Sequence, residues 1–177
     1  RSGMKIMELV LRGISARQIV TPAALDNAIR VDMAIGGSTN TTLHLPAIAN
    51  EANISLDLKD FDRLSRTTPN LCRFKPNGPY NFTELEGAGG VAAVMKRLDR
   101  LLHPDAITVS GKTVGENIKA AVVKNDELIR PLNKAYASEG GIAVLYGSLA
   151  PEGAVVKTSA SSTAPFTAPS TFSRRPP

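Results

Sequence analysis

Apolar residues recur at helical spacing near the start of the chain. Residues 4–11 alternate apolar and polar positions with this period, and Gly13 follows them as a residue typical of helix C-termini. Thr21 offers a capping hydroxyl and Pro22 is favoured in a first turn, so a second helix is expected to begin here. Its apolar positions continue to Gly36, where glycine predicts the end of the helix.

A further helix is expected directly after this glycine turn. Ser38 or Thr39 can cap it, because either hydroxyl can accept a hydrogen bond from a free amide at a helix start. Pro46 lies inside or near its first turns, which predicts a kink or a late start. The apolar face of this helix is expected to consist of Leu43, Ala47 and Ile48.

Shorter elements are predicted in the middle of the chain. Asp60 is expected to cap a short helix, and Thr83 with Glu86 three residues later fits a capping box. Residues 106–109 are typical of a short strand, and residues 113–123 of a helix. Between Glu86 and residue 106, an amphipathic helix is predicted from an apolar stripe of Val91, Val94, Met95, Leu98 and Leu102.

The pattern changes to short strands after Asp126. Residues 142–146 and 154–156 are apolar runs separated by glycine and proline, which indicates a β-rich segment. Residues 160–177 contain no Leu, Ile or Val and are expected to be disordered or to come from a shifted reading frame. The pattern therefore predicts an α/β protein with a boundary after residue 127 and a tail after residue 159.

Composition excludes several classes of protein. Hydrophobic residues make up 42% and charged residues 21%, which is ordinary for a globular protein. The net charge of +5 is scattered and aromatic residues are only 5%, so neither a basic stripe nor a stacking platform for nucleic acid is present. The apolar runs are too short to span a membrane. One cysteine, Cys72, fits a reducing compartment, and we expect a cytoplasmic protein.

The turn Gly36-Gly37-Ser38-Thr39-Asn40 is the most distinctive motif. Its glycines permit close backbone approach, and amides at the next helix start would favour an anion such as a carboxylate. Gly37, Ser38, Thr39 and Asn40 are therefore candidate substrate-binding residues. A simple capped turn between two helices explains the same residues.

No catalytic or metal-binding residue is predicted from this chain. Cys72 is more typical of a small buried hydrophobic residue than of a ligand, and one thiolate cannot hold an iron–sulfur cluster. His44 and His103 lack the spacing of a metal site, although His44 lies near the glycine turn as a weak acid–base candidate.

Several segments resemble one family in order along most of the chain. The segment VDMAIGGSTNTTLHL, residues 31–45, resembles a middle segment of the dihydroxy-acid/6-phosphogluconate dehydratases. The C-terminal segment of the resemblance is GGIAVLYGSLAPEGAVVK, residues 140–157. The other matching segments are residues 60–65, 88–95, 108–113 and 129–132.

The resemblance implies both a fold and a reaction. It implies that residues 1–127 are the C-terminal part of an α/β N-terminal domain, and that residues 128–159 are the first strands of a β-rich second domain. Such enzymes remove water from a 2,3-dihydroxy carboxylic acid with an iron–sulfur cluster and Mg²⁺, and they yield a 2-oxo acid. The segments that carry the cluster cysteines and the catalytic serine are absent, so we expect a fragment that is inactive alone and holds neither group.

Alternatives stay open at this point. The substrate is expected to be a dihydroxy acid of branched-chain amino-acid biosynthesis, and the complete enzyme a homo-oligomer. A sugar-acid dehydratase of the same family is the first alternative. A non-catalytic module that binds a small molecule or a partner on the same scaffold is the second.

Overall fold

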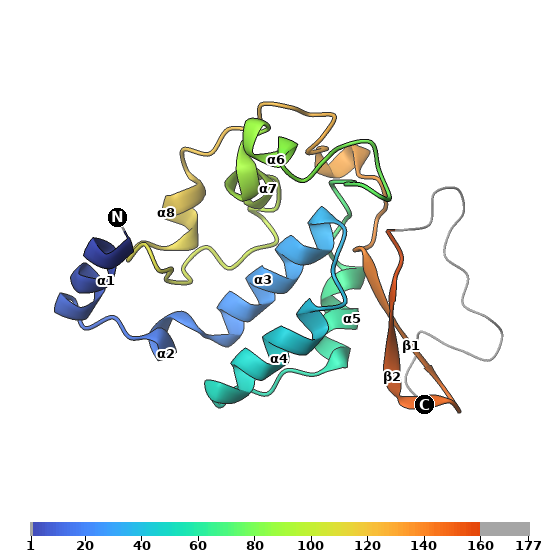
Figure 1. Ribbon diagram of the computed structural model, residues 1–177, viewed down its shortest axis with the longest axis horizontal. Coiled ribbons are helices and arrows are strands. Elements are labelled where there is room, and N and C mark those ends of the chain that lie inside the picture. Colours follow the sequence, from blue (N-terminus) through green and yellow to red (C-terminus); the bar gives the residue numbers. More distant parts are fainter. Residues whose placement is uncertain (1, 160–177) are drawn as a thin grey trace.

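The structure, a computed structural model, describes residues 2–159 and consists of helices followed by one antiparallel hairpin (Figure 1). The expected α/β class is confirmed in this form. In chain order the elements are α1 Ser2–Leu11, α2 Ala16–Ile19, α3 Pro22–Ile35, α4 Thr41–Glu51, α5 Leu58–Arg66, α6 Glu84–Gly87, α7 Gly90–Arg97, α8 Val114–Ile118, the 3-10 helix η1 Leu132–Lys134, β1 Ile142–Gly147 and β2 Ala150–Lys157.

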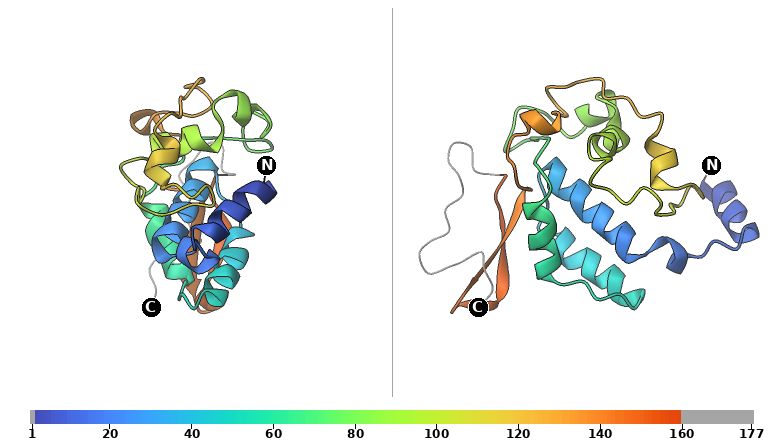
Figure 2. Two further views of the ribbon diagram at one scale, coloured as in Figure 1. Left: turned by 90° about the vertical axis from the view of Figure 1, so that its left-hand side faces the viewer. Right: turned by 180° about the vertical axis from the view of Figure 1, so that it is seen from behind.

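Helix α3 is the central element of the fold. It runs between α6, α7 and α8 on one side and α4 and α5 on the other (Figure 1), and the view from behind shows α5 between α3 and the hairpin (Figure 2). Two clusters of buried side chains meet along it. Ala34 belongs to a cluster with α7 and α8, whereas Ile29 and Met33 pack with Phe61, Leu64 and Ile142.

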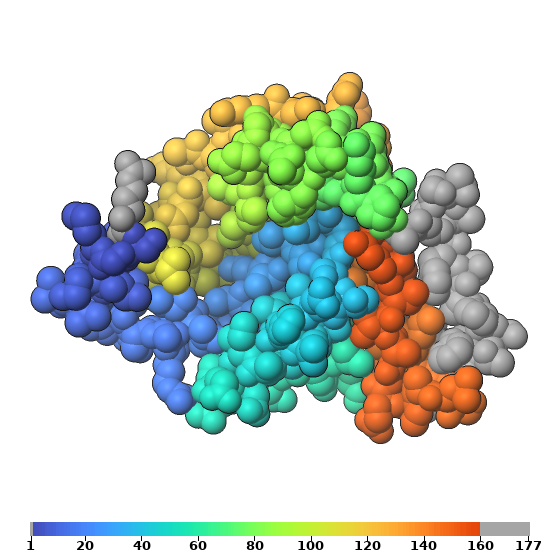
Figure 3. Space-filling model, viewed as in Figure 1, coloured from blue at the N-terminus to red at the C-terminus, as the bar shows by residue number. Residues whose placement is uncertain are grey.

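The hairpin is anchored to the helices at its open end. Ile142 of β1 pairs with Lys157 of β2, and the ladder continues to Gly147 opposite Ala150 with an irregularity after Leu145. The Ser65 hydroxyl of α5 donates to the Ile142 carbonyl at 2.5 Å. The space-filling view shows the hairpin against the side formed by α4 and α5 (Figure 3). The hairpin is thereby fixed to α5 by a hydrogen bond and to α3 by the packing of Ile142.

The two predicted helices at the start of the chain are confirmed. Helix α1 covers the first predicted stretch, and α3 begins where Thr21 and Pro22 predict it. The Thr21 hydroxyl accepts from the Ala24 amide at 3.2 Å. Gly36 ends the helix with φ 114°, a left-handed conformation that favours glycine. Local signals at both ends of α3 were therefore sufficient to predict where this helix begins and ends.

Three predicted helix caps are wrong. Helix α4 begins at Thr41, so its cap residue is Asn40 and not Ser38 or Thr39. The Asn40 side chain makes no capping hydrogen bond. The cap of α5 is Asp57, whose carboxylate accepts from the Lys59 and Asp60 amides, so Asp60 is the reciprocal partner rather than the cap. At α6, Thr83 makes no cap bond, and the Glu84 side chain accepts from the Asn81 amide instead. Only at α5 does the side chain of a neighbouring polar residue accept from amides of the first turn.

Other expectations are corrected in extent. Residues 106–109 form only an isolated bridge, Ile107 to Thr113, and the helix expected over residues 113–123 ends at Ile118. The apolar face of α4 is not covered within the described residues: Leu43 is 68% exposed and Ile48 47%. The predicted boundary after residue 127 stays a prediction, and the predicted tail, residues 160–177, lies outside the described residues. Within residues 2–159, no helix is long and apolar enough to cross a membrane.

Candidate functional site

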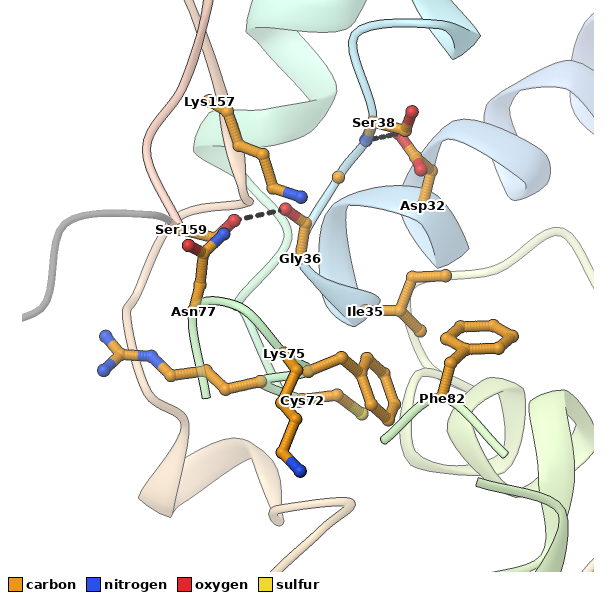
Figure 4. A pocket seen from close by; sticks show the side chains of 13 residues that line it. Asp32, Ile35, Gly36, Ser38, Cys72, Lys75, Asn77, Phe82, Lys157 and Ser159 are labelled. Carbon is orange, nitrogen blue, oxygen red and sulfur yellow. Dashed lines mark hydrogen bonds between the residues drawn. The ribbon is translucent and has the colours of Figure 1, made fainter. Parts of the chain in front are cut away.

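A hollow of about 230 Å³ opens beside the glycine turn that ends α3 (Figure 4). Three segments far apart in the sequence enclose it: the end of α3 with its turn, the loop that follows Leu71, and the chain at the end of β2. Its lining residues are Asp32, Ile35, Gly36, Gly37, Ser38, Cys72, Arg73, Phe74, Lys75, Asn77, Phe82, Lys157 and Ser159.

Backbone contacts bring these segments together. The Ala34 carbonyl of α3 accepts from the Leu71 and Cys72 amides at 2.7 and 3.0 Å, which fixes the loop to the end of the helix. The Ser159 hydroxyl donates to the Gly36 carbonyl at 2.5 Å, which fixes the end of β2 to the turn (Figure 4). The walls of the hollow are therefore held by hydrogen bonds rather than by packing alone.

The glycines of the turn allow the hairpin to approach the backbone closely. Gly37 has φ 70°, and a Cβ on it would lie 2.6 Å from Ile142 Cγ1. A Cβ on Gly141 would lie 2.0 Å from the Gly36 carbonyl oxygen. Real Cβ atoms do not approach other atoms this closely, so both positions need glycine for packing alone.

The amides of the turn are largely occupied within the turn itself. The Gly37 amide donates to the Asp32 carbonyl, and the Ser38 amide to the Asp32 carboxylate at 3.3 Å. The Asn40 amide donates to the Ser38 hydroxyl, and the Thr41 amide to the Ser38 carbonyl. The turn therefore does not offer the row of free amides from which an anion site was expected here. Charged side chains around the hollow supply the attraction for an anion instead.

The structure separates the four predicted substrate-binding residues into two pairs. Gly37 and Ser38 line the hollow. Thr39 and Asn40 are exposed and do not line it. The Thr39 carbonyl accepts from the Thr42 hydroxyl, and Asn40 occupies the cap position of α4. All four remain proposals as binding residues, and the geometry supports the first pair more directly.

Asp32 is a site residue that the sequence interpretation missed. Its side chain is buried, with 9% of the residue exposed, and Oδ2 accepts from the Thr41 hydroxyl at 2.8 Å and from the Ser38 amide. Burial raises the pKa of this carboxyl, while the Thr41 hydroxyl, the Ser38 amide and the charge of Lys157 oppose the rise. The signal available in the sequence was the spacing of Asp32, which follows Ile29 by three residues. This spacing places its carboxylate on the buried face of the helix.

The hollow has a cationic part and an apolar part. Lys157, Lys75 and Arg73 contribute positive charge against the single carboxylate of Asp32, and the Arg73 guanidinium lies 4.9 Å from the centre of the Tyr136 ring. Ile35, Phe74 and Phe82 form the apolar part. The Phe74 and Phe82 rings meet edge to face with centroids 5.0 Å apart. Such a lining suits a small anion that carries a short hydrocarbon group.

The described residues do not provide a ligand set for a metal ion or an iron–sulfur cluster. No group of three His, Cys, Asp or Glu side chains within residues 2–159 is placed to hold a metal. Cys72 is fully buried, and burial raises the pKa of its thiol to about 12. His44 is exposed on α4, and His103 lies near Asp26, 3.5 Å from Nε2 to Oδ2. Neither histidine lines the hollow.

Comparison with known proteins identifies the family. Residues 1–117 match the family model "Dihydroxy-acid/6-phosphogluconate dehydratase N-terminal", and residues 127–173 match its C-terminal counterpart. The chain is 55% identical to the dihydroxy-acid dehydratases of Oleidesulfovibrio alaskensis over 163 residues and of Clostridium novyi over 161, and 53% identical to that of Pyrococcus furiosus over 161. These alignments cover 90% of this chain and 29% of each relative. The chain belongs to the dihydroxy-acid/6-phosphogluconate dehydratase family.

Proposed function

We propose that this chain is part of a dehydratase that converts a 2,3-dihydroxy carboxylic acid to a 2-oxo acid. The observation that carries the proposal is the 53–55% identity to curated dihydroxy-acid dehydratases over 90% of the chain. In this reaction the C2 proton and the C3 hydroxyl leave together as water, and the resulting enol tautomerises to the 2-oxo acid. Since the chain spans 29% of the length of these relatives, the activity is proposed for a longer protein.

The contribution that we propose for this chain is to bind and orient the substrate. Gly37 and Ser38 would form one side of the substrate site, with Thr39 and Asn40 beyond them. The apolar part of the hollow favours a branched-chain dihydroxy acid, because a hydrocarbon side chain gains from contact with Phe74 and Phe82. A sugar acid presents hydroxyl groups to the same surface and would leave them without hydrogen-bond partners there.

The iron–sulfur cluster and Mg²⁺ implied by the family do not fit the described residues, since no suitable ligand group lies among residues 2–159. We propose that residues outside this chain hold both groups in the longer protein, and that the isolated chain is inactive. Homo-oligomeric assembly and a cytoplasmic location belong to the same proposal. Both expectations rest on the resemblance to this family.

A chimaera tests the proposed function. This chain replaces the matching segment of the Oleidesulfovibrio alaskensis enzyme, and 2-oxo acid formation is measured after anaerobic reconstitution with iron and sulfide. We expect turnover of the branched-chain dihydroxy acid by the chimaera and none by the isolated chain. Turnover of gluconate alone would favour the sugar-acid alternative. A folded, reconstituted chimaera without turnover, together with a monodisperse and stable isolated chain, would favour the non-catalytic binding module.

A further inference from the structure

We propose that Lys157 binds the carboxylate of the substrate in the hollow and that Asp32 is its positioning partner. This inference rests on the proposed function and deepens it. Nothing in the pattern of the sequence singled out either residue. The two come from opposite ends of the chain: Asp32 lies in the segment that matches the N-terminal family model, and Lys157 in the segment that matches the C-terminal one.

The backbone of Lys157 is fixed at the mouth of the turn. Lys157 is the last residue of β2 and pairs with Ile142, whose side chain packs against Gly37 and whose carbonyl accepts from Ser65. The Lys157 side chain extends from this position toward the backbone of Gly36 and Ser38 (Figure 4). Because the pairing with Ile142 fixes its backbone beside the turn, the exposed Lys157 side chain can place its ammonium group at the rim of the hollow.

The charge of Lys157 is available for a ligand. Within residues 2–159 its ammonium group forms no ion pair and donates no hydrogen bond, while its charge acts on Asp32 at longer range. The other cations of the hollow differ from it. Arg73 is stacked near the Tyr136 ring, and the Lys75 side chain points away from Gly36 in Figure 4. Lys157 is therefore the cation best placed to meet an anion beside the turn.

Asp32 holds the surface that Lys157 faces. One carboxylate oxygen accepts from the Ser38 amide and the Thr41 hydroxyl, so it fixes the turn and the start of α4 together. Both donors belong to the protein itself, and the Asp32 side chain is largely buried. Its negative charge attracts the ammonium group of the exposed Lys157 side chain toward the turn.

The size and lining of the hollow define the ligand. A volume of about 230 Å³ is below the roughly 300–1,000 Å³ of pockets for drug-sized ligands, so the ligand is small. A carboxylate at Lys157 places the rest of the molecule toward the apolar part formed by Ile35, Phe74 and Phe82. The hollow therefore suits a short-chain carboxylic acid bound by its charged end at the turn.

Kinetics of the chimaera test the two roles. Lys157→Met should raise KM for the dihydroxy acid about tenfold with kcat changed less than about threefold, because a ground-state contact to the carboxylate is lost. Lys157→Arg should restore most of the affinity. Asp32→Asn keeps an oxygen for the Ser38 and Thr41 bonds and loses only the charge, so it should raise KM by a smaller factor. Combined with Lys157→Met it should add nothing further.

The matched control is Lys119→Met, which removes one exposed lysine at the end of α8, away from the hollow. It should leave KM unchanged. An unchanged KM in Lys157→Met, or equal increases in both lysine variants, would overturn the role of Lys157. Fully additive effects of Asp32→Asn and Lys157→Met would overturn the positioning role of Asp32.

Binding to the chain itself separates this inference from the proposed function. 3-Methyl-2-oxobutanoate is titrated into the full chain, and the amide resonances of Gly36, Gly37 and Ser38 are followed by NMR. Lys157→Met should weaken binding about tenfold and Lys119→Met should not. If the chimaera never turns over, the dehydratase proposal fails while this titration still decides the role of Lys157. If the wild-type chain does not bind the acid and the chimaera is inactive, both are overturned.

Discussion

Gly141→Ala tests how the hairpin is joined to the helices. A Cβ at Gly141 would lie 2.0 Å from the Gly36 carbonyl oxygen and 2.2 Å from its carbon, so backbone has to move against backbone and no rotamer change can relieve the clash. Separation of the two segments weakens three hydrogen bonds. These are Gly141 amide to Met33 carbonyl at 3.2 Å, Gly140 amide to Ser65 carbonyl at 2.8 Å, and Ser159 hydroxyl to Gly36 carbonyl at 2.5 Å.

The expected loss of stability is large. Overpacking costs about 1–3 kcal/mol, and each weakened hydrogen bond about 0.5–1.5 kcal/mol. Partial loss of all three bonds brings the total to about 3–5 kcal/mol, against about 5–15 kcal/mol for a whole domain. Urea denaturation of the chain, followed by circular dichroism, measures the change in the free energy of unfolding. Hydrogen exchange at the Gly140 amide, which donates to the Ser65 carbonyl at 2.8 Å, reports whether the hairpin has separated from the helices.

Gly87→Ala is the matched control, because a Cβ at Gly87 meets no atom within 4 Å. It lies in α6 and should be neutral or stabilise by up to about 1 kcal/mol, since alanine loses less backbone entropy on folding than glycine. A loss below about 1 kcal/mol in Gly141→Ala, with unchanged exchange at the Gly140 amide, would refute the close contact between the hairpin and the turn.

Three further predictions concern buried and exposed side chains. Burial raises the pKa of Asp32 above its ordinary value of 3.8, so ionisation of Asp32 destabilises the fold as the pH rises through the folded-state pKa. Asp32→Asn should therefore raise Tm at pH 7. This gain in Tm should be lost below about pH 3.8, where the carboxyl is protonated in both states. With a pKa raised from 9.0 to about 12, the Cys72 thiol at pH 8 should react with iodoacetamide at least about a thousandfold more slowly in the folded chain than in urea, and similar rates would contradict its burial. Leu43→Ser and Ile48→Ser should each change the free energy of unfolding by less than about 0.5 kcal/mol, whereas Phe61→Ala should lower it by about 3–5 kcal/mol in the same urea titration.

Helix ends were predictable where the chemistry of capping is local and has one candidate. Thr21 and Gly36 bound α3 as expected, because the capping hydroxyl and the left-handed residue act within a few positions of their own. At α5 two carboxylates compete, and Asp57 takes the cap that Asp60 was expected to hold. A sequence pattern alone does not rank two chemically equal candidates three residues apart.

The apolar face predicted for α4 fails for a different reason. The periodicity places Leu43, Ala47 and Ile48 on one side of the helix, but only Ala49 of α4 is buried within the described residues. A periodic pattern shows which residues can share a face and not which element covers that face. The relatives are more than three times as long as the matched segment, so a covering element outside this chain is consistent with the pattern.

The hollow itself could not be predicted from local pattern. Its lining spans residues 32–159, and it forms because two hydrogen bonds to Ala34 and one to Gly36 bring distant segments to the end of α3. Of the predicted binding residues, Gly37 and Ser38 reach it because they directly follow Gly36, whereas Thr39 and Asn40 lie exposed at the start of α4. Arg73, Lys75 and the two aromatic rings come from a loop in which no motif was visible, and Lys157 ends a segment whose resemblance gave no role to its side chain.

The two glycines of the turn acquire a different physical meaning from the structure. Sequence pattern suggested that they let a ligand approach free amides. Most of these amides are occupied, and the backbone of Gly141 and the side chain of Ile142 lie against Gly36 and Gly37. The glycines therefore join the segment that matches the N-terminal family model to the one that matches the C-terminal model. That junction also carries Lys157 to the rim of the hollow. A substitution that separates the segments should thus weaken ligand binding even where it touches no lining side chain.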